Sequence, residues 1–177
     1  MAKSSRLLFP ISALLLAGLG LLGPGGCRPA PVPGPGRDPG SPGSVVLPTL
    51  EGGTYRLGDG RDDVLVVTFF ATWCMPCIAE VPYLRTLHHR PGVRVVGISV
   101  DEGGEKVLRP FRDHFEIDYP ILLADEEMTL GRSPFGHIPG IPATFVLDRR
   151  REVHAAILGG IAPSTFDPIL AEAAGKK

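Results

Sequence analysis

The fold is decided by the stretch at residues 64–77, VLVVTFFATWCMPC. Its first seven residues are an almost continuous apolar run, which is typical of a strand covered on both faces. Cys74 and Cys77 follow at once, three positions apart. Pro76 lies between them, and proline is well tolerated in the first turn of a helix. The stretch therefore predicts a buried strand that leads into a helix carrying a Cys-x-x-Cys motif.

A cysteine pair at the start of a helix favours reversible disulfide chemistry. The first turn of a helix has unpaired N–H groups and a partial positive charge, which favour thiolate over thiol, and the thiolate is the attacking species in disulfide exchange. We expect Cys74, at the mouth of the helix, to be exposed and to act as the nucleophile. Cys77 lies about one turn further in, so we expect it to be shielded and to resolve the mixed disulfide. Trp73 is expected either to flank the site or to pack in the core.

Two other uses of a cysteine pair are less consistent with this sequence. Zinc sites usually need a second cysteine pair or two histidines at a defined spacing, and Cys27 is the only other cysteine. A purely structural disulfide would close a very small ring, which constrains the unfolded chain little. We therefore predict a redox site that uses neither a cofactor nor a metal.

The rest of the pattern predicts an α/β sandwich with a mixed sheet and flanking helices. Strands are expected at 64–70, 93–100, 121–123, 143–147 and 153–158, and helices at 76–90, 105–116 and 164–175, the last with Ser164 as its N-cap. Crossover connections between the first strands require parallel pairing. The last two strands form a hairpin, and its turn holds three consecutive arginines, Arg149 to Arg151, which we expect to lie in solvent.

Three segments resemble the thioredoxin-like superfamily and, within it, the exported thiol-disulfide oxidoreductases of the TlpA/ResA type. They are FFATWCMPC at 69–77, EVP at 80–82 and GIPATFVLD at 140–148, and the resemblance extends over about residues 45–172. It implies a thioredoxin-like three-layer sandwich with an inserted helix near 101–120. It also implies protein disulfides or dithiols as substrates, such as the cysteines of apocytochrome c. A membrane electron donor of the DsbD/CcdA kind is the implied partner.

The resemblance also assigns roles to residues outside the cysteine pair. The proline that matches Pro142 is cis in this family and packs against the active sulfurs, which leaves the neighbouring backbone at Ile141 free to pair with a substrate chain. The glutamate that matches Glu80 assists the dithiol. A carboxylate in apolar surroundings tends to have a raised pKa and can pass a proton. The alternative for Glu80 is a surface charge that stabilises the first turn of the helix.

Two other functions remain possible for such a fold. A copper-delivery protein pairs two cysteines with a distant histidine, for which His137 is the candidate, but such proteins space the cysteines more widely. A redoxin-type peroxidase would have a Pro-x-x-x-Thr-x-x-Cys site. Here Thr72 lies two places before Cys74, and no proline stands four places before Thr72. His137 itself is expected to be an exposed loop residue.

The first 44 residues predict export and anchoring. Lys3 and Arg6 precede a short uncharged apolar run, which is typical of a signal peptide over residues 1–26. Cys27 follows two glycines and resembles a lipoprotein attachment site, where acyl chains would hold the protein on a membrane. Residues 27–44 are rich in proline and glycine and are expected to be a tether to a domain at 45–177.

From these features we expect a location in the bacterial cell envelope, anchored to a membrane and facing the periplasm. The formal net charge of −1 and the absence of a basic stripe give no reason to expect a nucleic-acid partner.

Overall fold

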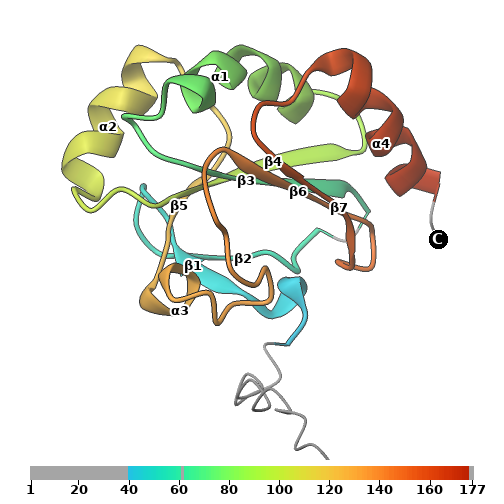
Figure 1. The fold of residues 1–177 in the computed structure, drawn as a ribbon, viewed down its shortest axis with the longest axis horizontal. Coiled ribbons are helices and arrows are strands. Elements are labelled where there is room, and N and C mark those ends of the chain that lie inside the picture. Colours follow the sequence, from blue (N-terminus) through green and yellow to red (C-terminus); the bar gives the residue numbers. More distant parts are fainter. Residues whose placement is uncertain (1–39, 61, 176–177) are drawn as a thin grey trace, which may run out of the picture. The chain divides into compact units, whose positions relative to one another are not determined.

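The computed structural model describes residues 40–60 and 62–175, and its centre is a five-stranded mixed sheet (Figure 1). The strands are β3 (Val64–Phe70), β4 (Val93–Ser99), β5 (Ile121–Leu123), β6 (Ala143–Leu147) and β7 (Val153–Leu158). Their order in the sheet is β5-β4-β3-β6-β7. β4 is parallel to β3 and β5, whereas β6 is antiparallel to β3 and β7. All five expected strands are present, and β4 ends one residue early.

Three longer helices cover one face of this sheet (Figure 1). They are α1 (Met75–His88), α2 (Glu105–His114) and α4 (Pro163–Gly175). α2 lies between the parallel strands β4 and β5 in the sequence, at the place expected for the inserted helix. The expected N-cap at Ser164 is wrong. α4 begins at Pro163, so Ser164 is its second residue, and the carbonyl of Ala162 accepts hydrogen bonds from the N–H groups of Thr165 and Phe166. Proline is favoured at the first helical position because an N–H there would have no partner within the helix.

The opposite face is covered by short elements that the sequence did not predict. They are the β1 (Val46–Pro48) and β2 (Thr54–Arg56) hairpin and the one-turn helix α3 (Glu126–Thr129). Figure 1 shows all three on the side of the sheet away from α1. β5 is equally short, but its three residues form an apolar run, which is why it was predicted. β1 ends in proline, and β2 and α3 contain mostly polar residues, so none of the three shows an apolar run or a hydrophobic period. Together with the sheet and the helices they complete the three-layer sandwich.

The side chains of β3 are divided between two hydrophobic clusters. All seven residues of β3 are buried. Val64, Val66 and Phe70 belong to the cluster that includes residues of α1, α2 and α4. Leu65 and Phe69 belong to the cluster that includes residues of β1, α3 and β6. Successive side chains of a strand point to opposite faces, so a continuous apolar run is what a strand buried on both faces requires.

The register of the sheet brings two distant parts of the sequence to one edge. β3 and β6 are antiparallel, and Phe69 lies opposite Ala143. The end of β3 and the start of β6 therefore meet at the same edge of the sheet. The cysteine motif follows β3 and the Ile141–Pro142 bond precedes β6, so both lie at this edge.

The opposite edge of the sheet contains the β6–β7 turn, where one expectation is wrong. Arg151 is only 1% exposed, although Arg150 is in solvent as expected. The Arg151 guanidinium donates to backbone carbonyls of the loop before β3 and of its own turn, and the acceptors are Leu57, Asp59, Gly60, Asp63 and Asp148. An arginine has five N–H donors, so a cluster of backbone carbonyls can accept its hydrogen bonds and allow the side chain to be buried.

The expected signal peptide at 1–26, Cys27 and most of the tether lie outside the described residues. The last part of the expected tether is described, and it is folded: Pro42–Ser44 form a 3₁₀ turn in which Pro42 is buried. Within residues 40–60 and 62–175, no helix is long and apolar enough to span a bilayer.

Candidate active site

Cys74 and Cys77 form a disulfide at the beginning of α1. Their Sγ atoms are 2.07 Å apart and their Cα atoms 5.3 Å apart. Cys74 is the N-cap residue of α1, and its Sγ accepts a hydrogen bond from the backbone N–H of Cys77 at 3.3 Å. This N–H is one of the donors that a helix leaves without an internal partner. The first turn therefore directs a donor and the positive end of the helix at Cys74 Sγ, which favours a thiolate there.

The expected difference in depth between the two cysteines is wrong. Cys74 is 5% exposed and Cys77 is 4% exposed. As an N-cap, Cys74 turns its side chain back over the first turn of the helix, and the disulfide holds both sulfurs in the hydrophobic cluster under α1. The neighbouring Trp73 and Met75 are more than 70% exposed. Trp73 thus flanks the site and does not pack in the core.

The loop that carries the cysteines is fixed by Asp101, which sequence reasoning missed. The Asp101 carboxylate accepts hydrogen bonds from the backbone N–H of Thr72 at 3.0 Å and from the Thr72 hydroxyl at 2.8 Å. It also accepts one from the Ser99 hydroxyl at 2.8 Å. The only sequence signal was the position of Asp101, just after a strand that is parallel to β3 and ends at the same edge.

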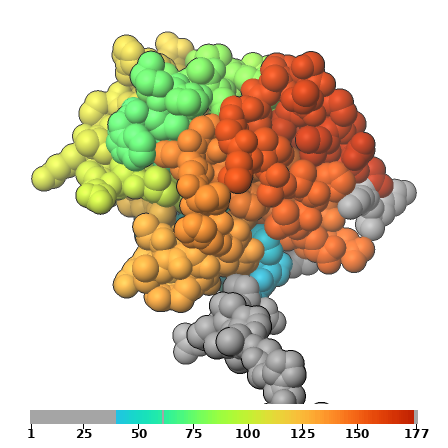
Figure 2. Space-filling view, in the orientation of Figure 1, coloured from blue at the N-terminus to red at the C-terminus, as the bar shows by residue number. Residues whose placement is uncertain are grey.

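The Ile141–Pro142 peptide bond is cis, as the resemblance implied. Pro142 is buried, and its carbonyl accepts a hydrogen bond from the N–H of Gly159 at 2.8 Å. Ile141 is half-buried and packs against both hydrophobic clusters. In Figure 2 the green segment that begins α1 borders the orange segment that leads into β6. The structure therefore brings the beginning of α1 and this proline loop side by side, at the edge of the sheet where β3 ends.

Glu80 is a buried acid one turn after Cys77 on α1, which excludes the alternative of a surface charge. It is 5% exposed, and its Oε1 accepts a hydrogen bond from the backbone N–H of Ile161 at 2.6 Å. Its Oε2 is buried and has no hydrogen-bond partner among the described residues. Burial raises the pKa of Glu80 to about 6, and the bond from Ile161 limits the rise. Glu80 can therefore take up or release a proton near neutral pH.

A cavity of about 220 Å³ lies between the site and α3, and its walls are mostly apolar. Both expected substrate-binding residues, Trp73 and Ile141, line it. The full lining is Phe69, Trp73, Val100, Met128, Thr129, Ile138, Pro139, Gly140 and Ile141. His137 is exposed in the loop that approaches this cavity but does not line it. Across residues 40–60 and 62–175, no three His, Cys, Asp or Glu side chains are grouped so that they could hold a metal ion.

The sequence matches the family model described as the AhpC/TSA family over residues 43–156, which is more than half of the chain. The chain therefore belongs to this thioredoxin-like family. The match includes the cysteine pair, Glu80 and Pro142, and it ends within β7.

Two named proteins and one solved structure are similar to the chain. The chain is 32% identical over 117 residues to the thiol-disulfide oxidoreductase ResA of Geobacillus kaustophilus, and this covers 64% of the chain and 65% of that protein. It is 27% identical over 119 residues to the thioredoxin-like protein YneN of Bacillus subtilis, covering 63% and 68%. Among solved structures, a thiol:disulfide interchange protein from Chlorobium tepidum matches with a TM-score of 0.66 and 30% identity, covering 78% of this chain and 99% of that one.

Proposed function

We propose that this protein is an exported thiol-disulfide oxidoreductase that exchanges the Cys74–Cys77 dithiol and disulfide with cysteines of other proteins. The observation that carries the proposal is the disulfide at the N-terminus of α1, where Cys74 Sγ accepts the Cys77 N–H. The names of the relatives support it, since both ResA and the Chlorobium protein are thiol-disulfide proteins by name.

The reducing direction begins with Cys74. Its thiolate attacks one sulfur of a substrate disulfide, so a Cys74–substrate S–S bond forms and the substrate S–S bond breaks. The second substrate sulfur leaves as a thiolate and takes a proton. The hydrogen bond from Cys77 N–H and the helix dipole stabilise the attacking thiolate, so Cys74 is the nucleophile even though the two cysteines are equally buried.

Cys77 completes the exchange. Its thiol loses a proton and attacks Cys74 Sγ, which forms the Cys74–Cys77 disulfide and releases the first substrate sulfur. Two electrons pass to the substrate, and its two sulfurs gain two protons. Glu80 lies one turn further along α1, and with a pKa of about 6 its carboxylate can accept the Cys77 proton.

The surface around the disulfide would hold the substrate chain. The loop at Ile141 and the cis proline at Pro142 lie at the same edge of the sheet as the cysteines. Trp73 is exposed and forms one wall of the cavity beside them. We propose that an extended substrate segment lies along Ile141, with a side chain in this cavity.

We further propose that the protein acts as a reductant, with apocytochrome c cysteines or other periplasmic disulfides as targets. A membrane protein of the DsbD/CcdA kind would then return two electrons to the Cys74–Cys77 disulfide after each turnover. This finer assignment is supported by the resemblance to the TlpA/ResA type, and it depends on the reduction potential of the pair. Thioredoxin-like dithiols range from about −270 mV for a reductant to about −120 mV for a strong oxidant.

A redox equilibrium with glutathione or dithiothreitol tests this proposal. The protein is equilibrated at a series of thiol/disulfide ratios, and the fraction of oxidised Cys74–Cys77 is followed by alkylation and mass spectrometry. We expect a single two-electron transition nearer to about −270 mV than to about −120 mV. A potential near the oxidising end would overturn the reductant assignment, and a pair that never exchanges would overturn the oxidoreductase itself.

Anchoring through Cys27 is a separate part of the proposal. The sequence before Cys27 and the proline- and glycine-rich segment after it support export followed by lipid attachment. We expect a mature chain that begins at Cys27 and carries acyl groups, measured by mass spectrometry of the mature protein. Cys27→Ala should release a domain that is still redox-active. An unmodified mature terminus beyond Cys27 would contradict the anchor.

A further inference from the structure

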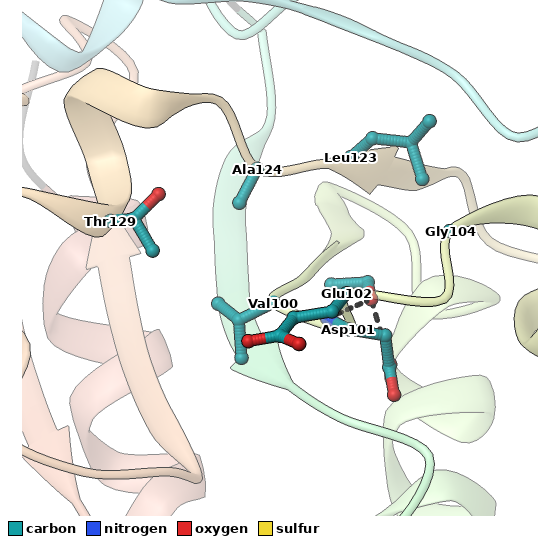
Figure 3. Close-up of a pocket in the computed structure, with 8 residues that line it drawn as sticks. Val100, Asp101, Glu102, Gly104, Leu123, Ala124 and Thr129 are labelled. Atoms are coloured by element: carbon teal, nitrogen blue, oxygen red, sulfur yellow. Dashed lines mark hydrogen bonds between the residues drawn. The ribbon is translucent and has the colours of Figure 1, made fainter.

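A second cavity adjoins the one beside Trp73 and Ile141. It has a volume of about 270 Å³, and it shares Val100 and Thr129 with the first cavity. Val100 and Asp101 directly follow β4, and Figure 3 shows them apart from Thr129 of α3, which lies across the cavity from Val100. The two cavities therefore adjoin at Val100 and Thr129, and we refer to the pair as the groove; its lining extends from Trp73 and Ile141 to the segment that precedes α2.

The far end of this groove differs in character from the end beside the disulfide. Among the described residues, no charged side chain lines the first cavity, whereas two carboxylates, Asp101 and Glu102, line the second. No lysine or arginine of the described part of the chain lines either cavity. Along the groove the surface therefore changes from apolar beside the cysteines to acidic at the far end.

The two carboxylates are not equally available to a ligand. Both oxygens of Asp101 are engaged by Thr72 and Ser99, so Asp101 holds the active-site loop. Glu102 is exposed and makes no hydrogen bond or ion pair with any other described residue. Its side chain is drawn in Figure 3 beside Val100. An incoming cation would therefore meet Glu102 without displacing an existing contact.

We propose that this groove selects substrate polypeptides that carry a bulky apolar side chain near the reactive cysteine and a lysine or arginine a few residues away. The apolar side chain fills the cavity beside Trp73 and Ile141, and the cation pairs with Glu102. The inference rests on the proposed oxidoreductase function and specifies its substrate class. Glu102 acts here as a specificity residue, and it does not touch the reacting sulfurs.

The expected size of the effect follows from the exposure of Glu102. An ion pair between exposed side chains contributes little and weakens with salt. We therefore expect about a two- to fivefold preference in kcat/KM for a cationic over an anionic substrate at low salt. The preference should shrink at high salt. A charge that steers the approach of the substrate acts on KM and the association rate more than on kcat.

The test uses peptide disulfides that differ at one position only. Each peptide has a leucine beside its cysteine, and a position three residues away is Lys, Gln or Glu. The reduced full chain is assayed for peptide reduction at low and high salt. We expect kcat/KM to fall in the order Lys, Gln, Glu at low salt. Equal values for the three peptides would overturn the inference while leaving the oxidoreductase function intact.

A pair of variants assigns the preference to the groove. In Glu102→Gln the Lys/Glu ratio of kcat/KM should fall to about one. Glu152→Gln makes the same change in net charge at the β6–β7 turn, at the opposite edge of the sheet, and should keep the wild-type ratio. A ratio unchanged in Glu102→Gln, or lowered equally in both variants, would overturn the inference. If wild type reduces none of the peptides, the proposed function itself is wrong, and this inference fails with it.

Discussion

The two edges of the central sheet each bury a charged side chain, and they do so in opposite ways. Arg151, in the β6–β7 turn, donates to five backbone carbonyls. Glu80, beside the disulfide, accepts one hydrogen bond and keeps one oxygen without a partner among the described residues. A buried group with all its hydrogen bonds made serves the fold, whereas an acid left partly unsatisfied has a shifted pKa and is available for chemistry.

Arg151→Met should have the largest effect on stability. The substitution removes the guanidinium and leaves several buried carbonyls without a donor, so we expect the free energy of unfolding to fall by about 3–5 kcal/mol. Urea unfolding followed by circular dichroism measures this. Arg150→Met is the matched control, because Arg150 is exposed and should change stability by less than about 0.5 kcal/mol. A small loss in Arg151→Met would mean that this edge does not depend on the buried cation.

Asp101→Asn tests whether a fully hydrogen-bonded polar side chain also stabilises the fold at the edge of the sheet that carries the disulfide. Asp101 accepts bonds from Thr72 and Ser99, and an amide offers one acceptor oxygen where the carboxylate offers two. We expect a loss of about 2–3 kcal/mol in unfolding free energy and slower disulfide exchange, because the loop before Cys74 is released. Asp113→Asn, an exposed charge on α2, is the control for both measurements. An unchanged unfolding midpoint in Asp101→Asn would show that the loop is held by other contacts.

Glu80→Gln should give the smallest change, and the change should depend on pH. Burial raises the pKa of Glu80 from 4.5 to about 6, so the folded state holds the proton more tightly than the unfolded state does. The contribution of Glu80 to stability is therefore full below about pH 4.5 and is lost as pH rises to about 6, a difference of about 2 kcal/mol. In Glu80→Gln this fall should be missing from a series of unfolding curves measured across that pH range.

The control for Glu80→Gln is Glu152→Gln, which neutralises an exposed carboxylate and should keep the wild-type pH profile. The wild-type rate of disulfide exchange should also change near pH 6, and this change should be absent in Glu80→Gln. Parallel pH profiles for wild type and Glu80→Gln would contradict the assignment of Glu80 as a buried acid.

The sequence predicted those parts of the fold that long patterns encode. Apolar runs such as 64–70 and 143–147 located the strands of the large sheet, and the Cys-x-x-Cys motif after β3 located the disulfide. The hairpin of β1 and β2 and the helix α3 were missed, because they are short and, unlike the equally short β5, contain no run of apolar residues bounded by turn signals.

The environment of single residues was harder to predict, because it depends on contacts between distant segments. Glu80 is buried partly by the segment at Ile161, 81 residues later in the chain. Arg151 is buried because the loop before β3 presents its carbonyls to the β6–β7 turn. Cys74 is buried because it caps its own helix and bonds to Cys77. Local patterns report propensity and periodicity, and they carry no information on such tertiary contacts.

Trapping the mixed disulfide tests directly whether Cys74 is the nucleophile. Cys77→Ser and Cys74→Ser are each reduced, mixed with a peptide disulfide and analysed by mass spectrometry under denaturing conditions. The two cysteines are equally buried, so the outcome depends on the hydrogen bond and the helix dipole at Cys74. We predict a stable peptide adduct on Cys74 in Cys77→Ser and no adduct in Cys74→Ser. Adducts that form equally fast in both variants would contradict this prediction.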